Sequence, residues 1–485
     1  MAVLIPKSTD QQLSPLLYGP SSTPSGSILG RTLHSPTPLI TAADAHTLTL
    51  STTHTLLDST SGAAVSCLGH SHPVVTSALI STLSTPAPVY VNSILFNTPI
   101  AEEAGSVILS EANAAATACG GAEDSFGRVY FCGSGSEACE AALKLGRQYF
   151  VEKEGAGTKR RRWISRWGSY HGTTLGALSV SGHYARRKVF EDILLPQGEG
   201  GNVSFVSACN AYRGKKEGET DWDYGQRLVR ELDEEFQRVG PDSVIAFLAE
   251  PVVGAALGCV TAVEGYWKGC KEVCERYGAL MVADEVMCGI GRTGGMFAFQ
   301  AEGVVPDLVT VGKGLGGGYV PVAGVVVGQK VVGVLDKGTG AFAHGHTYQA
   351  HPLACTAIVA VQKVIRQENL LANVVTRGKQ LEALLEEQLA GHKHVGNIRG
   401  RGLFWGIEFV KDKETKEPFP VSDGVSSKVC ERALELGICL YPCAGSAGEG
   451  KGDHVLICPP YTITEGEIEK IVEVARRAVV DVLGE

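Results

Sequence analysis

The chain has 485 residues, of which 44% are hydrophobic and 20% are charged, so it is long enough for more than one hydrophobic core. Its net charge of −9 and its pI of about 5.9 argue against the basic surface with which proteins bind nucleic acids. Its apolar runs fall short of the roughly 18 residues that a membrane helix needs, so we expect no membrane span.

The N-terminal region contains no targeting signal that we can assign. Residues 1–7 hold too few apolar residues for a signal sequence, and residues 8–60 are rich in serine and threonine but poor in arginine, which disfavours a mitochondrial leader. The 14 cysteines are irregularly spaced and include no Cys-x-x-Cys pair, so we interpret them as buried thiols and expect no metal site. These features predict a cytoplasmic protein.

From about residue 125 onward, strand-like runs of β-branched residues alternate with helical patterns. The expected strands cover residues 128–132, 163–167, 203–206, 244–249, 279–284, 308–311 and 322–327. The expected helices include 137–150, 224–239 and 266–277. This alternation predicts an α/β fold whose large domain has a mostly parallel, mixed sheet covered by helices. In such a sheet the functional side chains gather at the carboxyl ends of the strands.

The pattern changes after about residue 350. A charged helix over 370–389 precedes an alternating strand over 398–409, and a final helix repeats apolar residues at a helical period over 468–482. We expect residues 61–350 to form the large domain. Residues 1–60 and 351–485 would together form a smaller α+β domain from the two ends of the chain.

Two polar residues follow apolar segments of the expected sheet. Asp284 ends the segment 279–284, and Lys313 lies in the glycine-rich stretch 312–318. An accessible amine can form a Schiff base, and a carboxylate can hold a pyridinium nitrogen. An isolated aspartate at such a position is as often a helix cap. Read together, the two residues predict a site for pyridoxal phosphate, with Lys313 and Asp284 as catalytic residues.

Other segments could complete that site. Ser134, Gly135 and Ser136 join a strand to a helix, where free backbone N–H groups and the helix dipole favour a phosphate. Tyr170 follows a second strand, where its ring could stack on a flat cofactor. Each feature alone has a plainer explanation as a connecting turn or as packing, so the interpretation depends on their order and spacing.

That order resembles the class III (omega-amino-acid type) aminotransferases of the pyridoxal phosphate fold type I. The resemblance covers roughly residues 28 to 482. The matching stretches are residues 69–73, 134–138, 170–172, 249–251, 284–286 with 291–294, 312–315, 345–348 with 351–352, and 459–460.

The resemblance implies an enzyme that moves an amino group from an amine or omega-amino acid to a keto acid through a Schiff base on Lys313. Asp284 would hold the pyridine nitrogen of pyridoxal phosphate, and Tyr170 and Val286 would cover the two faces of its ring.

The family also implies how the phosphate is bound. Gly135 and Ser136, beside Ser134, would hold it within one subunit. Thr347 would reach the phosphate of a neighbouring subunit, so the resemblance implies a homodimer with the active site at the subunit interface.

Members that act on α-amino acids often carry an arginine just before the late Pro459-Pro460 pair, where Leu456 stands in this chain. This difference favours the omega-transaminases, although Arg399 or Arg401 could also bind a carboxylate. Tyr90, Phe96 and Trp405 could line the substrate entrance by their position; ordinary packing explains them equally well.

Other outcomes remain open at this point. Class III includes an aminomutase, amino-acid epimerases and a decarboxylase that share residues of the Lys313 and Asp284 type. A catalytically inactive relative is disfavoured because both residues are present with their flanking motifs. A NAD-linked dehydrogenase is disfavoured because the glycines at 314–318 do not open a βαβ fingerprint.

Overall fold

The computed structural model describes residues 14–19, 27–31, 33 and 36–485, so residues 1–7 and much of the serine- and threonine-rich segment lie outside the described residues. The chain divides into two compact units, and each is described by itself. The large unit comprises Pro73–Gly254 and Val260–Leu371, and the small unit comprises Met1–His72, Ala255–Cys259 and Ala372–Glu485.

The large unit is built on a sheet of seven strands in the order β4-β12-β11-β10-β7-β5-β6. Only β12 runs against its neighbours, because it pairs antiparallel with both β4 and β11, whereas the other pairs are parallel. The expected mostly parallel, mixed sheet is therefore confirmed. Its strands are β4 (Phe126–Cys132), β5 (Arg162–Arg166), β6 (Val203–Val206), β7 (Val244–Ala249), β10 (Leu280–Asp284), β11 (Leu308–Val311) and β12 (Ala323–Gly328).

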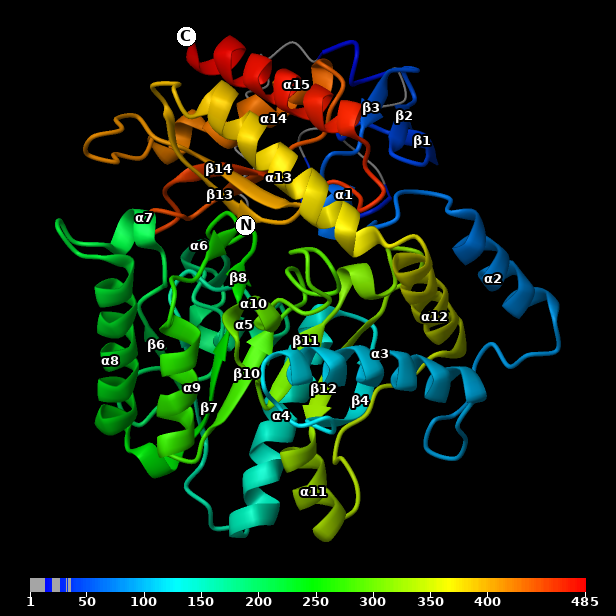
Figure 1. Ribbon diagram of the computed structural model, residues 1–485, viewed down its shortest axis with the longest axis vertical. Coiled ribbons are helices and arrows are strands. Elements are labelled where there is room, and N and C mark those ends of the chain that lie inside the picture. Colours follow the sequence, from blue (N-terminus) through cyan, green and yellow to red (C-terminus); the bar gives the residue numbers. More distant parts are fainter. Residues whose placement is uncertain (1–13, 20–26, 32, 34–35) are drawn as a thin grey trace. The chain divides into compact units, whose positions relative to one another are not determined.

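Helices surround this sheet, and a two-stranded sheet of β8 (Val252–Val253) and β9 (Val260–Thr261) lies among the connections (Figure 1). The longer helices are α2 (Pro73–Ser84), α3 (Pro99–Ala118), α4 (Gly135–Glu154), α8 (Asp221–Val239), α9 (Tyr266–Arg276), α11 (Gln329–Lys337) and α12 (Pro352–Gln367). The short ones are α5 (Leu175–Ser179), α6 (Tyr184–Arg187), η1 (Glu191–Ile193), α7 (Ala211–Gly214), η2 (Pro241–Ser243), α10 (Phe299–Glu302) and η3 (Lys313–Leu315).

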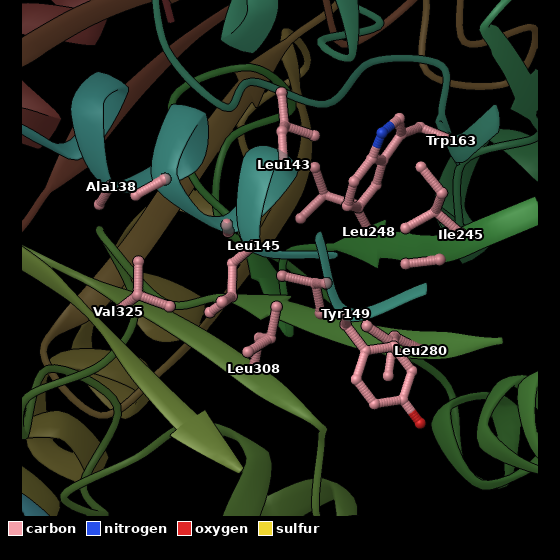
Figure 2. Packing of buried hydrophobic residues seen from close by; sticks show 14 of the residues in the cluster. Ala138, Leu143, Leu145, Tyr149, Trp163, Ile245, Leu248, Leu280, Leu308 and Val325 are labelled. Carbon is pink, nitrogen blue, oxygen red and sulfur yellow. The ribbon is translucent and has the colours of Figure 1, made fainter. Parts of the chain in front are cut away.

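Helix α4 packs its apolar face on the strands, and this contact forms the main core of the large unit (Figure 2). Leu280 and Val282 of β10 both belong to this cluster. They alternate with Met281 and Ala283, whose side chains point to the opposite face, because successive residues of a strand face opposite ways. Met281 and Ala283 are also buried, so the strand is covered on both faces, as parallel sheets usually are.

The small unit contains a three-stranded sheet in the order β1-β2-β3 and a four-stranded antiparallel sheet in the order β13-β14-β16-β15. The first has the strands β1 (Ile40–Asp44), β2 (Thr47–Leu50) and β3 (Thr55–Leu57), and the second has β13 (Val395–Arg401), β14 (Phe404–Phe409), β15 (Tyr441–Ala444) and β16 (Asp453–Ile457). The helical segments are α1 (Ser61–Ala64), α13 (Leu370–Leu389), η4 (Val421–Asp423), α14 (Val425–Glu435) and α15 (Glu465–Leu483).

One sequence-based expectation for the small unit is wrong. The segment 398–409 is not a single strand, because β13 and β14 form an antiparallel hairpin that turns at Gly402 and Leu403. Gly402 has a φ of 60°, a value that glycine adopts without steric cost. The apolar alternation continues on both sides of this short turn and so conceals it.

No disulfide joins the 14 cysteines, all of which lie in the described ranges, and most of them are buried. This agrees with the interpretation of the cysteines as small hydrophobic side chains. Among the helices in the described ranges, none combines the length and the apolar character needed to cross a bilayer.

We predict that Leu280→Ala destabilises the large unit by about 3 kcal/mol, because it leaves a cavity in the core between α4 and the sheet. Leu280 is 0% exposed, whereas Leu175 on α5 is 54% exposed and serves as the matched control. Urea unfolding followed by circular dichroism measures both variants. Equal shifts for the two variants would contradict this placement of the core.

Candidate active site

The carboxyl ends of neighbouring strands bring the candidate residues together. Strands β11, β10, β7 and β5 lie side by side in this order. Lys313 follows β11, Asp284 ends β10, Glu250 follows β7, and Tyr170 lies in the loop after β5. Because the four strands are parallel, these residues gather at one edge of the sheet.

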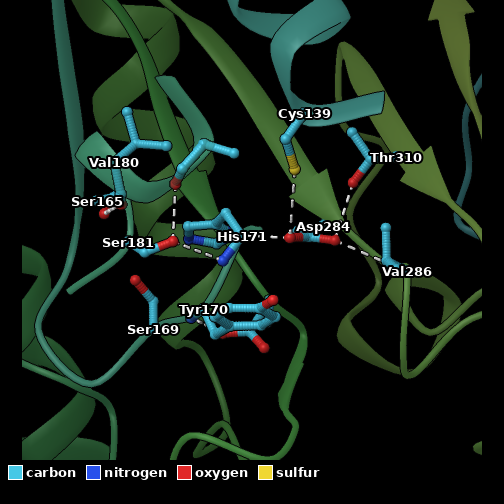
Figure 3. A network of polar contacts seen from close by, with 12 residues as sticks. Cys139, Ser165, Ser169, Tyr170, His171, Val180, Ser181, Asp284, Val286 and Thr310 are labelled. Atoms are coloured by element: carbon cyan, nitrogen blue, oxygen red, sulfur yellow. Dashed lines mark hydrogen bonds and ion pairs between the residues drawn. The ribbon is translucent and has the colours of Figure 1, made fainter. Parts of the chain in front are cut away.

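Asp284 is 4% exposed and lies at the centre of a hydrogen-bond network (Figure 3). Its Oδ1 accepts hydrogen bonds from the Thr310 hydroxyl at 2.9 Å and from the Val286 N–H at 3.1 Å. Its Oδ2 lies 2.7 Å from Nδ1 of His171 and 3.7 Å from the Cys139 thiol. A buried carboxylate needs such partners to offset the loss of hydration, and this one has them from several elements.

His171, Cys139 and Asp284 offer ligand atoms that all lie within 4.8 Å of one another, a spacing that a metal ion could use. However, burial raises the pKa of the Cys139 thiol well above its ordinary value. The thiol is therefore protonated and donates a hydrogen bond to Asp284, an arrangement that accounts for the three groups without a metal. We assign the three groups to the Asp284 network.

The turn before α4 has the geometry of an anion site. The Ser134 hydroxyl caps the helix by accepting a hydrogen bond from the Glu137 N–H at 3.3 Å, and Gly135 is the first helical residue. The first N–H groups of a 20-residue helix have no partners within the helix and attract negative charge. The Ser136 hydroxyl accepts a hydrogen bond from the Thr173 N–H at 3.0 Å, which joins this turn to the loop after β5.

Val286 packs against two glycines of the motifs. A Cβ atom added to Gly135 would lie 2.7 Å from Cγ1 of Val286, and one added to Gly312 would lie 3.3 Å from the same atom. The valine therefore occupies the space that side chains at positions 135 and 312 would fill. Through Val286, the anion turn, the Asp284 loop and the Lys313 turn meet.

Lys313 begins η3 with a φ of 48°. This left-handed conformation is uncommon for residues other than glycine and costs free energy, so the surrounding structure must impose it. The preceding Gly312 is extended, and the lysine is partly buried. Strained residues of this kind cluster at functional sites.

Tyr170 is held on two sides. Its N–H donates a hydrogen bond to Oε2 of Glu250 at 3.2 Å. The guanidinium carbon of Arg186 on α6 lies 4.1 Å from the centroid of the Tyr170 ring, a cation–π contact. One ring face is thus occupied by a cation.

Two buried glutamates flank Asp284 along the sheet edge. Burial raises the pKa of Glu250 to about 7, and the negative Asp284 adds to this rise. Burial raises the pKa of Glu285 to about 8, although the N–H groups of Ala298 and Phe299 donate to its two oxygens at 2.5 and 2.7 Å. Glu285 thereby anchors the start of α10.

Other residues singled out from the sequence have surroundings of their own. Thr347 is exposed in the loop before α12. In the small unit, Leu456 is buried in β16, and the Trp405 indole donates to the Gly402 carbonyl at 2.7 Å. Arg399 forms an ion pair with Glu408 at 2.6 Å.

Arg399 also donates to the carbonyl groups of residues 257 and 258. These acceptors and Glu408 belong to the small unit, where they engage the guanidinium of Arg399.

A family model for class III aminotransferases matches residues 31–479.

The chain belongs to the class III aminotransferases.

Similar proteins agree with this assignment. An aminotransferase of Gibberella zeae is 47% identical over 451 residues, which cover 93% of this chain and 85% of that protein. A solved (S)-enantioselective omega-transaminase from Thermomicrobium roseum is 30% identical with a TM-score of 0.82, covering 92% of this chain and 93% of that one. A PLP-bound amine transaminase from an uncultivated Pseudomonas species is 26% identical with a TM-score of 0.84, covering 96% and 98%.

This class III aminotransferase is therefore an enzyme with fold type I, and its cofactor is pyridoxal phosphate. The site fits that cofactor on its own geometry. Asp284 presents a buried carboxylate suited to a protonated pyridine nitrogen, and the turn before α4 presents unpaired N–H groups to an anion. The absence of side chains at Gly135 and Gly312 lets Val286 pack between the two turns.

The sequence analysis missed the partners of Asp284. His171 stands 113 positions before it and Thr310 stands 26 positions after it. Thr310 could have been found, because β11 neighbours β10 and its third residue lies level with Asp284. For His171, which lies within the quoted stretch 170–172, and for Cys139, which directly follows the stretch 134–138, the sequence holds no signal of a contact with Asp284.

Glu285→Gln tests whether burial raises the pKa of Glu285, and the free energy of unfolding is the quantity measured. Between about pH 4.5 and 8, folded Glu285 holds a proton that the unfolded chain has released, so its contribution to the free energy of unfolding falls as the pH rises. Glutamine removes this dependence. We expect the variant to gain stability relative to the wild type with rising pH, by up to about 1.4 kcal/mol per pH unit.

Urea unfolding at pH 5, 6, 7 and 8 measures this difference, with Glu103→Gln on the exposed side of α3 as the control. Parallel stability curves for wild type and Glu285→Gln would show that Glu285 is ionised throughout the range.

Proposed function

We propose that Lys313 is the residue to which the cofactor attaches covalently and that it then carries the proton of the reaction on Nζ. The observation that carries this proposal is the placement of Lys313 and Asp284 after adjacent parallel strands, with a strained backbone at the lysine. When bound, pyridoxal phosphate draws electrons from the carbon that bears the amino group. The chain must then supply a base near that carbon.

The other residues of the group have binding roles in this proposal. Asp284 holds a proton on the pyridine nitrogen, and the His171 imidazole and Thr310 hydroxyl fix the orientation of its carboxylate. The N–H groups at Gly135 and Ser136, with the turn at Ser134, bind the phosphate. Tyr170 and Val286 cover the two faces of the cofactor ring. Tyr170 would contact the cofactor with the ring face opposite Arg186.

We propose amines or omega-amino acids as the amino donors and a keto acid as the acceptor. Two observations support this class of donor. The structures similar to this chain include an omega-transaminase and an amine transaminase. Leu456 is buried and apolar within β16, so this position cannot hold an α-carboxylate.

We predict that Lys313→Ala lowers transamination by at least about 10³-fold, because it removes both the attachment point and the proton carrier. Lys313→Arg is the matched control for charge: it keeps the cation but lacks a primary amine, so it is expected to be equally inactive. The measurement is alanine formation from pyruvate with 4-aminobutyrate or butylamine as donor. Circular dichroism confirms that both variants fold, and turnover by either variant would refute the assignment.

We also propose that the enzyme is a homodimer whose partner subunit contributes Thr347 to each site. Apolar side chains are exposed in the segment before α3: Ile94 is 88%, Leu95 is 70% and Phe96 is 63% exposed. A patch of this kind usually marks an interaction surface. Tyr348, beside Thr347, is 66% exposed. Its ring lies 5.9 Å from that of Tyr90, so the loop and this segment form one surface.

If this surface is the dimer interface, Leu95→Asp produces monomers and reduces activity, because burying a charge there is unfavourable. Sedimentation velocity measures the mass, for which a dimer of 51.1 kDa subunits is expected in the wild type. Val375→Asp, an exposed position on α13, is the control and should leave the dimer intact. An active wild-type monomer would contradict the proposal.

Two further assignments belong to this proposal. The many buried thiols support a reducing compartment, and we propose the cytoplasm. We also propose that the large unit is the cofactor-binding domain and that the segments at the two ends of the chain form the small domain.

A further inference from the structure

A keto acid carries a carboxylate, and so does an omega-amino acid, so a site that binds either substrate needs a cation to hold it. Several cations of the large unit near the cofactor site are already engaged. Nη2 of Arg166 donates to the Glu250 carbonyl at 2.6 Å. Nη1 of Arg187 donates to three carbonyl groups between residues 178 and 181, at 2.8 to 2.9 Å. Lys313 is reserved for the reaction itself.

Arg186 differs from these residues. Its guanidinium lies over the ring of Tyr170 at 4.1 Å, and the structure pairs it with no carboxylate in the part of the chain that it describes. Its Nε has no hydrogen-bond partner in the described ranges, a property that it shares with Nε of Arg166 and of Arg187, so the difference lies in its remaining donors and its exposure. The side chain as a whole is only partly buried, so part of it is open to solvent.

The stacked geometry leaves the donors of Arg186 available. A guanidinium that stacks on an aromatic ring uses its flat face, whereas its five N–H groups point outward in its plane. Those in-plane groups form the fork that binds a carboxylate with two parallel hydrogen bonds. The ring contact also restrains the long side chain in advance, so less conformational entropy is lost on binding.

The neighbouring acids make a cation necessary for a carboxylate substrate. Asp284 and Glu250 lie at the same sheet edge, and Glu250 contacts the backbone of Tyr170. A substrate carboxylate that approaches these groups without a compensating cation would be repelled. Arg186 supplies that cation beside Tyr170.

We propose that Arg186 binds the carboxylate of the substrate and so selects omega-amino acids, in which a carbon chain separates amine and carboxylate, over simple amines. This inference rests on the proposed function and adds the group that the substrate must carry. Arg186 is a specificity-determining residue, whereas Tyr170 remains the residue that contacts the cofactor.

The test compares donors that differ only by the carboxylate. The pairs are β-alanine with ethylamine, 4-aminobutyrate with propylamine, and 5-aminopentanoate with butylamine, each with pyruvate as acceptor under saturating pyridoxal phosphate. In Arg186→Met, we expect kcat/KM for the best amino acid to fall about 10- to 100-fold, mainly through KM, because a charge-assisted fork is lost. The matched amine should change by less than about 3-fold, and Arg186→Lys should give an intermediate loss because lysine offers only a point charge.

A binding measurement separates this role from a general effect on turnover. Isothermal titration calorimetry of the loaded enzyme with butanoate, which has a carboxylate but no amine, should show a Kd about 10- to 100-fold weaker in Arg186→Met. Lys188→Met, which removes an exposed cation two residues away, should leave both measurements unchanged. The visible absorption band of the bound cofactor should also be unchanged in Arg186→Met, which shows that Tyr170 keeps its place.

Three results would overturn the inference. Equal losses for amino acid and matched amine would mean that Arg186 only positions Tyr170. A wild-type enzyme that prefers the amine of every pair, or butanoate affinity that is unaffected by Arg186→Met, would show that the carboxylate is not bound there. If the wild type converts no donor of either kind, the proposed function fails, and this inference fails with it.

Discussion

The buried carboxylate of Asp284 is the interaction on which the rest of the site depends. A charge that is 4% exposed persists only when hydrogen bonds replace its lost hydration. Here the donors come from β11, from the loop after β5, from α4 and from the residue two positions after Asp284 itself. The carboxylate therefore fixes these elements relative to one another, and they also carry Lys313, Tyr170 and the anion turn.

Two acids that neighbour Asp284 have raised pKa values. Glu250, with a pKa of about 7, and Glu285, with a pKa of about 8, retain their protons at a pH where an exposed glutamate would have lost its own. The two groups lie beside Asp284 along the chain or the sheet. Near pH 7 Glu285 is mostly protonated and Glu250 is about half protonated, so most of the negative charge at this edge lies on the carboxylate that has several hydrogen-bond donors.

The sequence predicted the elements of the large unit closely where their bounds depend only on residues adjacent in the chain. Strands 244–249 and 308–311 have the expected bounds because their apolar runs are short and are bounded by polar residues or glycine. The hairpin at Gly402 was missed because its turn is too short to interrupt the alternation of apolar residues. The partners of Asp284 depend on which strands become neighbours, and a single sequence does not state that order.

The same distinction applies to Arg186. Its neighbour Arg187 has the same chemistry and also lies over an aromatic ring, that of Phe205, but it is 1% exposed and its Nη1 donates to backbone carbonyl groups. Arg186 lies over the Tyr170 ring and is only partly buried. Nothing in the local sequence separates the two arginines. The difference arises from the short helix α6, whose backbone directs consecutive side chains about 100° apart.

The contact of Val286 with Gly135 and Gly312 also constrains how this enzyme can diverge. A larger residue at either glycine would meet Cγ1 of the valine, and a smaller residue at 286 would leave a gap between the turns. Substitutions at the three positions are therefore expected to be correlated, although 177 residues separate the first from the last. A lineage that alters one of them must alter the others with it, or lose the fit of both turns around the cofactor.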